Sequence, residues 1–478
     1  MYRQSIYDEK LLKDIGSSRI TEDVDTGSYI SEDLMRGSEL KLPVLSELDV
    51  ARHYTRLSEM SFGVESGFYP LGSCTMKYNP KLGKKLVAMQ EFSDIHPYQP
   101  PETIQGTLEF MYWLEHILCV IGGMHAATLQ PPAGALGEFT GLLIAKAYFE
   151  HIGENRTDVI VPDTAHGTNP ASASMTGFNV VEVQSNEDGM VNIEKLKEVV
   201  SDKTSVFMLT NPNTLGIFEK NIKEISSIIH EAGALLYYDG ANINPIIGIT
   251  TPGKMGFDII HFNLHKSFGT PHGGGGPGAG PVAVTKKLEP FLPVPRVVFE
   301  KGMYNLDYNY PLSIGKVSSC YGNTSVLYMA YIYILSNGKN GLIKRAIRSV
   351  VNSNYMKEKL MKHFELPFYK NRMHEFVLSL RDIKERRGIK ASDFAKRLLD
   401  YGVHSPTIYF PLIVDEAFMI EPADTESVET MNAFIDAMLT ILNEDPELIK
   451  GAPYNTSCSR VNEVEAAKSL TVSWKYIK

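Results

Sequence analysis

The chain has 478 residues, of which 43% are hydrophobic and 22% are charged. These proportions are ordinary for a globular protein, and the length predicts about two or three domains. The formal net charge of −9 argues against nucleic acid as a partner, because phosphate binding needs a basic surface. No apolar run is long enough to span a bilayer, and the first ten residues lack an apolar signal core. We therefore expect a cytoplasmic protein without nucleic-acid or membrane partners.

The chain divides into three parts by composition. Residues 1–95 are polar and irregular, and we interpret them as an N-terminal arm that packs on something larger. Residues 96–330 alternate strand-like and helix-like patterns, which predicts a large domain. Residues 331–478 read as a smaller α+β domain at the C-terminal end.

The large domain has the clearest pattern of strands and helices. A helix is predicted over residues 218–233, with Ile222, Ile225 and Ile229 on one face and Gly233 at its end. Apolar runs predict short strands at residues 158–161, 205–209, 234–238 and 257–262. Alternation of strands and helices implies parallel pairing with right-handed crossovers, and therefore an α/β fold.

Polar residues follow each of these four strands. They occupy residues 163–166, 210–213, 239–242 and 263–266. In parallel sheets, ligands bind beyond the carboxyl ends of the strands. We therefore expect the four strand ends to form one site.

Lys266 is the first candidate for chemistry. It lies among aromatic and apolar residues, just before a glycine-rich run at residues 273–276. Apolar surroundings favour a buried amine with a lowered pKa, which suits a Schiff-base lysine, and the glycines let the backbone approach a ligand. The alternative is a solvated surface lysine beside a flexible loop.

Asp239 ends an apolar strand one strand before Lys266. A carboxylate in this position can keep the pyridine nitrogen of pyridoxal phosphate (PLP) protonated, which the cofactor needs in order to accept electrons. By itself, Asp239-Gly240 could equally be a turn. A Schiff-base lysine one strand later favours the cofactor role.

Two further segments would complete a cofactor site. His166 follows a strand and could stack on a flat ring, with the small Ala241 beneath it, although a loop histidine could also cap backbone groups. Gly134 and Ala135 lie where a strand passes into a helix, so their N–H groups could hold a phosphate; an ordinary turn is the alternative.

The sequence does not predict a metal site or a disulfide framework. The pair His261 and His265 has no acidic partner at metal-ligand spacing. The four cysteines are scattered and form no CxxC pair, and they stand at positions 74, 119, 320 and 458. We expect reduced thiols.

The order of these elements resembles that of fold-type-I PLP enzymes, and longer motifs resemble a narrower family. Glycine decarboxylase, the P-protein of the glycine cleavage system, has similar segments to residues 69–80, 165–173, 263–278 and 409–413 of this chain. The single-chain enzyme of that family is about twice as long. A chain of this size with the lysine is similar to subunit 2 of the split form.

The resemblance implies an activity and its partners. Glycine would lose CO₂ with PLP as cofactor, and its aminomethyl group would pass to the lipoyl arm of the H-protein. A homologous subunit 1 would complete the enzyme, with two copies of each subunit. Candidate contacts are His265 and His272 for proton transfer or phosphate, Asn213 for the phenolic oxygen of the cofactor, and Thr324 for its phosphate. Another PLP-dependent decarboxylase or aminotransferase, or a non-catalytic paralogue, is the alternative.

Overall fold

The fold was analysed in a computed structural model, which describes residues 3–15, 29–38, 43, 45–272, 278–369 and 371–470. The glycine-rich segment at 273–277 lies outside these residues. None of the described helices combines the length and the apolar character that crossing a membrane requires.

A seven-stranded sheet forms the centre of the described chain, in the order β1-β7-β6-β5-β4-β2-β3. Strands β2, β4, β5 and β6 confirm the four predicted strands, and β3, β2, β4, β5 and β6 run parallel. The antiparallel strands β7 and β1 complete one edge. The bounds are β1 (Ala126–Thr128), β2 (Asp158–Pro162), β3 (Asn179–Val183), β4 (Thr204–Thr210), β5 (Leu235–Gly240), β6 (Ile259–Phe262) and β7 (Val282–Val284).

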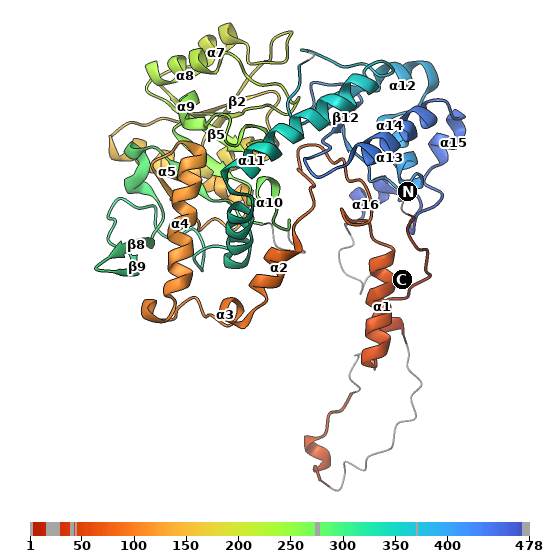
Figure 1. Cartoon of the computed structure of the whole chain (residues 1–478), viewed down its shortest axis with the longest axis horizontal. Coiled ribbons are helices and arrows are strands. Elements are labelled where there is room, and N and C mark those ends of the chain that lie inside the picture. The colour runs from red at the N-terminus through yellow and green to blue at the C-terminus, as the bar shows by residue number, and fades with distance from the viewer. Residues whose placement is uncertain are drawn as a thin grey trace.

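Helices cover both faces of this sheet and bury an apolar cluster on each (Figure 1). The predicted helix is α8 (Ile222–Glu231), whose Ile222, Ile225 and Ile229 are buried. On the other face, α5 packs so close to the sheet that a Cβ at Gly141 would lie 2.4 Å from the Tyr237 ring. The helices of this domain are α4 (Gln105–Gly122), α5 (Gly134–His151), α6 (Thr168–Thr176), α7 (Ile193–Val199), α8, α9 (Pro252–Met255) and α10 (Leu264–Ser267).

A second, smaller sheet lies in the C-terminal part, with the antiparallel order β10-β12-β11. It packs against helices around a separate apolar cluster, to which Phe68 of the N-terminal part also belongs. The elements are β10 (Phe376–Ser379), β11 (Thr407–Ile408), β12 (Ala417–Ile420), α12 (Arg381–Arg387), α13 (Ala391–Asp400), α14 (Val428–Leu442), α15 (Pro446–Gly451) and α16 (Glu463–Lys468). The two sheets confirm the predicted fold class.

The long helix α11 (Thr324–Leu360) connects the two cores (Figure 1). Leu342 and Ala346 belong to the core of the large sheet, whereas Met356 and Leu360 belong to that of the small sheet. The expected domain boundary at 330/331 therefore lies within a continuous element. The division into three domains stays a prediction.

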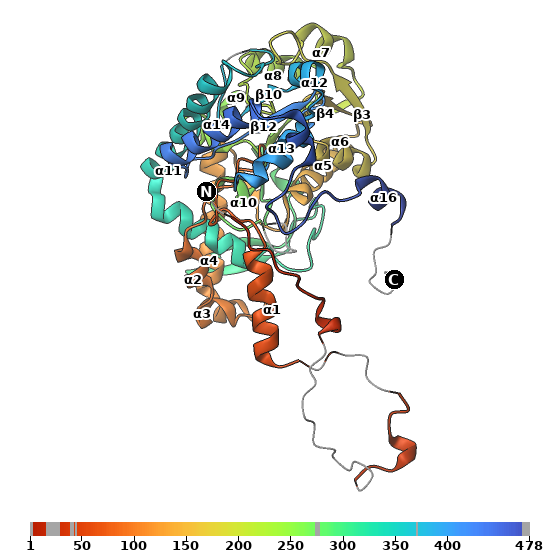
Figure 2. The ribbon, with the colours of Figure 1, turned by 90° about the vertical axis from the view of Figure 1, so that its right-hand side faces the viewer.

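In the N-terminal part, helix α1 (Glu47–Glu59) extends away from the body in both views (Figures 1 and 2). Helix α1 begins at a capping box formed by Ser46 and Asp49. Helices α2 (Lys81–Val87) and α3 (Gln90–Ser93) then lead into the large domain. The remaining elements are the hairpin β8 (Arg296–Glu300) and β9 (Met303–Asp307), and the 3₁₀ helices η1 (Leu12–Asp14), η3 (Glu32–Leu34), η4 (Pro101–Thr103), η5 (Asn244–Ile246) and η6 (Lys286–Phe291).

Candidate active site

A cavity of about 500 Å³ lies beyond the carboxyl ends of β2, β5 and β6. Of the site residues expected from the sequence, all but Asn213, Thr324 and His272 line it. These are Gly134, Ala135, His166, Asp239, Ala241, His265 and Lys266. The convergence of three strand ends on one cavity follows from their parallel pairing.

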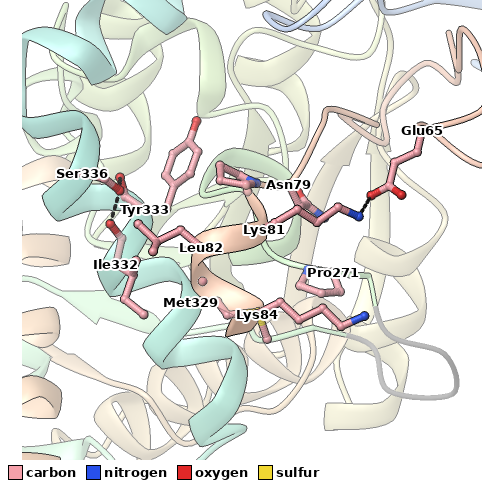
Figure 3. Close-up of a pocket in the computed structure, with 13 residues that line it drawn as sticks. Glu65, Asn79, Lys81, Leu82, Lys84, Pro271, Met329, Ile332, Tyr333 and Ser336 are labelled. Carbon is pink, nitrogen blue, oxygen red and sulfur yellow. Dashed lines mark hydrogen bonds and ion pairs between the residues drawn. The ribbon is translucent and has the colours of Figure 1, made fainter. Parts of the chain in front are cut away.

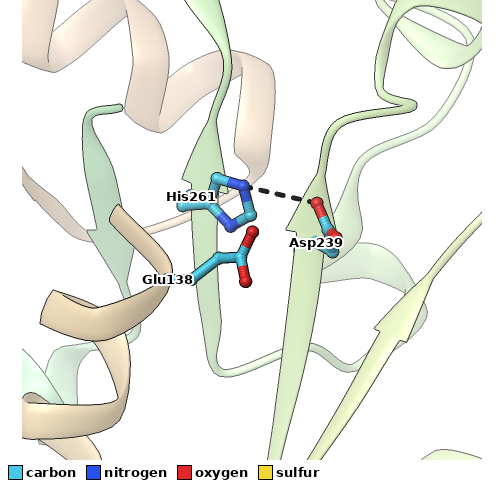
Figure 4. Close-up of side chains that lie close together, drawn as sticks. All are labelled: Glu138, Asp239 and His261. Carbon is cyan, nitrogen blue, oxygen red and sulfur yellow. Dashed lines mark ion pairs between the residues drawn. The ribbon is translucent and has the colours of Figure 1, made fainter. Parts of the chain in front are cut away.

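Asp239 lies at the end of β5 and is 1% exposed. Its carboxylate accepts hydrogen bonds from the Ala241 backbone N–H at 2.9 Å and from Asn169 Nδ2 at 3.0 Å. His261 Nε2, on the adjacent strand β6, lies 3.3 Å from Asp239 Oδ1 (Figure 4). Burial by itself raises the pKa of Asp239, but the His261 and His166 rings and these donors outweigh it and lower the pKa to about 2. The carboxylate is therefore ionised.

Glu138, on the first turns of α5, is a second buried carboxyl beside Asp239 (Figure 4). Burial and the nearby Asp239 charge raise the pKa of Glu138 to about 8. Asn169 Nδ2 donates to both carboxyl groups, at 3.0 Å each, and Thr168 Oγ1 donates to Glu138 at 2.9 Å. Near neutral pH the network thus holds one ionised and one protonated carboxyl group.

His166 follows β2 and lines the same cavity. Its Nε2 lies 2.9 Å from Ser73 Oγ, and its ring stacks on Phe410 with 5.4 Å between centroids. Burial lowers the pKa of His166 to about 4. A neutral, flat ring with one face on Phe410 is therefore held at the cavity wall.

Lys266 and His265 lie on α10, the short helix that follows β6. Lys266 lines the cavity and is partly buried. Burial lowers the pKa of His265 to about 3, and its Nδ1 has no hydrogen-bond partner among the described residues. The His272 ring packs edge-on against the His265 ring, with 5.2 Å between their centroids. His272 Nε2 shares a hydrogen bond of 3.1 Å with the Cys74 carbonyl oxygen.

Gly134 and Ala135 line the cavity and belong to the first turn of α5, where helix N–H groups have no partner within the helix. A Cβ at Gly134 would lie 2.0 Å from Asn263 Oδ1, so any larger residue here would force the Asn263 side chain to move. An anion-binding helix end, an ionised carboxylate and an amine thus meet in one cavity. This donor set fits PLP, with its phosphate, pyridine nitrogen and aldehyde.

Two of the expected contacts lie elsewhere. The Asn213 side chain binds backbone groups away from the cavity. Its Oδ1 accepts from Leu215 N and Ile217 N of its own loop, and its Nδ2 donates at 2.7 Å to the Gly189 carbonyl, between β3 and α7. The end of β4 therefore does not join the other three strand ends, contrary to expectation. Thr324 begins α11 and lines a different pocket, with Phe92 and Tyr328.

Several residues of the cavity had no role assigned to them from the sequence. Ser73 and Cys74 come from the N-terminal part, and Phe410 and Thr407 come from the C-terminal part. Burial raises the pKa of the Cys74 thiol to about 11, so it is not a thiolate. The available signal was the family-like segments 69–80, 165–173 and 409–413, which contain Ser73, Asn169 and Phe410.

A separate pocket lies between α2 and α11 (Figure 3). Asn79, Leu82, Met329 and Tyr333 line it, and an ion pair between Lys81 and Glu65 lies at its rim. None of the expected site residues lines this pocket.

The fold and the donor set define a fold-type-I PLP enzyme. Residues 140–300 match the family model "Aminotransferase class-V". The structure is similar in fold to the crystal structure of glycine decarboxylase (P-protein) of the glycine cleavage system, with a TM-score of 0.70, 21% identity, and coverage of 87% of this chain and 94% of that chain. Lactobacillus brevis glutamate decarboxylase is similar with a TM-score of 0.67 at 14% identity, over 86% of this chain and 96% of that chain.

Sequence comparison identifies the family. Residues 346–462 match the model "Glycine dehydrogenase, C-terminal domain". The probable glycine dehydrogenase (decarboxylating) subunit 2 of Thermoplasma acidophilum is 56% identical over 99% of this chain and 100% of its own length. That of Pyrococcus abyssi is 52% identical over 100% of this chain and 98% of its own length. The chain belongs to the glycine dehydrogenase (decarboxylating) subunit 2 family, the P-protein of the glycine cleavage system, EC 1.4.4.2. The predicted family, activity and cofactor are confirmed.

Proposed function

We propose that Lys266 attaches PLP covalently and that Asp239 holds its pyridine nitrogen protonated. His166 lies against one face of the ring, Ala241 lies against the other, and Gly134 and Ala135 bind the phosphate. The observation that carries this proposal is the shared cavity at three strand ends, lined by an amine, an ionised carboxylate and a helix N-terminus. PLP, when bound, supplies an aldehyde for amines and an electron sink for the decarboxylation.

The surrounding residues prepare the site in three ways. Asp239 offers its negative charge without a proton to lose, because its pKa lies near 2. The Ser73 and Phe410 contacts fix the plane of the His166 ring. His265, with a free Nδ1 among the described residues and a pKa near 3, is a neutral group available to a ligand.

We further propose the substrates and partners of the reaction. Glycine is decarboxylated, and its aminomethyl group passes to the lipoyl arm of the H-protein. The subunit 2 name of the relatives supports a homologous subunit 1 as partner, and we propose two copies of each subunit. We also propose a cytoplasmic location.

Replacing Lys266 tests the covalent attachment. The purified protein is expected to be yellow, and borohydride is expected to fix the cofactor to the chain. Lys266→Ala removes the amine, so both the visible absorbance of the attached cofactor and the fixation are lost. Lys254→Ala, at an exposed lysine outside the cavity, is the matched control and keeps both. Fixation that persists in Lys266→Ala would exclude this role.

Isotope exchange tests the reaction. Labelled bicarbonate is expected to enter the carboxyl group of glycine only when this chain, subunit 1 and lipoylated H-protein are present together. Activity that needs an amino acceptor and no carrier protein would instead indicate an aminotransferase.

A further inference from the structure

Residues 70–75 approach the cofactor cavity from the small sheet. Ser73 and Cys74 line the cavity, and Ser73 Oγ contacts His166 Nε2. Ser73 and Thr75 have φ angles of 63° and 49°, which are unfavourable for residues with a side chain. Interactions with the surrounding structure must hold this segment in its conformation.

Strand β12 provides part of this support. Leu71 forms a bridge with Ile420, and the Glu421 backbone N–H donates to the Pro70 carbonyl at 3.3 Å. A Cβ at Gly72 would lie 2.2 Å from Met419 Cγ, so the segment lies directly on the strand. These contacts attach the segment to the small sheet but leave the two strained residues unexplained.

Two buried carboxyl groups bind the strained residues directly. Glu375 precedes β10 and Glu421 follows β12, and the pairing of Phe376 with Ile420 places them opposite each other. Glu375 Oε2 accepts from the Ser73 backbone N–H at 2.7 Å, and Glu421 Oε2 accepts from the Thr75 backbone N–H at 2.8 Å. Their exposed fractions are 0% and 1%.

The two carboxyl groups differ in what their second oxygen, Oε1, contacts. Glu375 Oε1 accepts from Asn242 Nδ2 at 3.1 Å, which connects it to the loop after β5. Among the described residues, Glu421 Oε1 has no hydrogen-bond partner, and the ring nitrogens of His374 have none either. His374 Nε2 lies 3.8 Å from Glu375 Oε1 and 4.0 Å from Glu421 Oε1. Glu375 therefore accepts hydrogen bonds through both of its oxygens, and Glu421 accepts the Thr75 backbone N–H through one.

We propose that Glu375 and Glu421 are a pair of positioning residues. From the small sheet they hold the backbone N–H groups of Ser73 and Thr75, and thereby place Ser73 Oγ against His166 and Cys74 in the cavity wall. The proposal rests on the proposed place of His166 at the face of the cofactor ring. The pair then shapes the cofactor site without lining the cavity itself.

The number of acceptor atoms predicts unequal effects of the same substitution. Glutamine has only one acceptor oxygen in its side chain. In Glu375→Gln its NH₂ group would therefore face either Ser73 N–H or Asn242 Nδ2, and that donor would lose its acceptor. Glu421→Gln keeps an oxygen for Thr75 N–H and can turn its NH₂ group toward His374, whereas Glu421→Ala loses the acceptor. We expect Glu375→Gln and Glu421→Ala to raise KM for glycine about tenfold, the effect of one lost buried hydrogen bond. The KM of Glu421→Gln for glycine is expected to stay within about twofold of the parent value, because its hydrogen bond to Thr75 N–H is kept.

The measurement uses the holoenzyme reconstituted with subunit 1 and H-protein. The circular dichroism of the bound cofactor reports the orientation of its ring, and it is expected to change in Glu375→Gln and Glu421→Ala but not in Glu421→Gln. Ser73→Ala removes only the link to His166 and is expected to reproduce the altered dichroism, which keeps the test valid if a buried-acid variant does not fold. Glu416→Gln is the matched control, because Glu416 is a buried acid of the small domain that accepts from Ala391 N–H at 2.7 Å outside the cavity.

The outcomes separate this proposal from the proposed function. Unchanged dichroism and KM in Glu375→Gln and Ser73→Ala would overturn the positioning role while Lys266 keeps its own. Equal damage in Glu421→Gln and Glu421→Ala would also overturn it, because the acceptor count would not matter. Changes of equal size in Glu416→Gln would mean that loss of any buried acid has this effect, and would likewise overturn it.

Discussion

At the scale of single residues, the site depends on two carboxyl groups in different protonation states. Asp239 has polar partners on both oxygens, which outweigh the effect of its burial on its pKa. Glu138 is buried beside that charge, and a second negative charge there would be unfavourable, so Glu138 keeps its proton. Asn169 connects the two groups, so the charge is concentrated on the residue proposed to face the cofactor nitrogen.

Glu138→Gln tests this assignment through the pH dependence of stability. The folded chain keeps the Glu138 proton to about pH 8, whereas the ordinary glutamate pKa is 4.5. Between these values the unfolded chain binds fewer protons, so the contribution of Glu138 to stability falls as pH rises. In Glu138→Gln the free energy of unfolding of the cofactor-free protein is expected to fall less steeply between about pH 5 and 8.

Denaturant titrations at several pH values measure that slope. Glu194→Gln, at an exposed glutamate on α7, is the control and is expected to keep the parent slope. A slope in Glu138→Gln equal to that of the parent would show that Glu138 is not the protonated member.

At the scale of elements, α11 owes its course to one glycine. Gly338 has φ 58° and ψ −179° inside the helix, a conformation that is essentially restricted to glycine. Residues on both sides of the kink, such as Ile334 and Leu342, pack in the core of the large sheet, and α11 reaches the core of the small sheet further along, at Met356 and Leu360.

Gly338→Ala is expected to destabilise the protein by about 1–3 kcal/mol, the cost of that conformation for a residue with a side chain. A Cβ at this position meets nothing within 4 Å, so the effect is conformational and not steric. Gly106→Ala on α4 is the matched control: its Cβ also meets nothing within 4 Å, and alanine is expected to stabilise a helix by about 0.5–1 kcal/mol. Thermal or denaturant unfolding measures both, and a stabilising Gly338→Ala would contradict the assigned conformation.

At the scale of the whole molecule, a small apolar cluster joins the parts of the chain built around the large and the small sheet. Leu215 and Ile217, which follow β4, pack with Val377 of β10 and Met419 of β12. The same loop contacts the small domain through a hydrogen bond of 2.7 Å from Met373 N–H to the Gly216 carbonyl. The end of β4 therefore serves the domain interface instead of the cofactor cavity.

Leu215→Ala is expected to cost about 2–5 kcal/mol of unfolding free energy, as for other buried leucines, and also to weaken cofactor binding. The second effect follows because the interface it loosens adjoins Glu375, whose carbonyl oxygen would lie 1.9 Å from a Cβ at Gly216. Leu142→Ala, in the core of the large domain, is the control. It is expected to lose similar stability without a change in PLP affinity, measured by cofactor titration. Equal PLP affinities of the two variants would contradict the coupling.

The sequence by itself determined the local elements and much of the site. Apolar runs ending in polar residues marked β2, β5 and β6, and parallel pairing was enough to bring Lys266, Asp239 and His166 together. The tertiary structure decided the rest: that the chain after β4 packs on the small sheet, that Thr324 lies in another pocket, and that Glu375 and Glu421 bind the segment that carries Ser73 into the cavity wall. Periodicity records which face of an element is buried, but contacts between segments some 300 residues apart depend on how the domains pack, which no local pattern encodes.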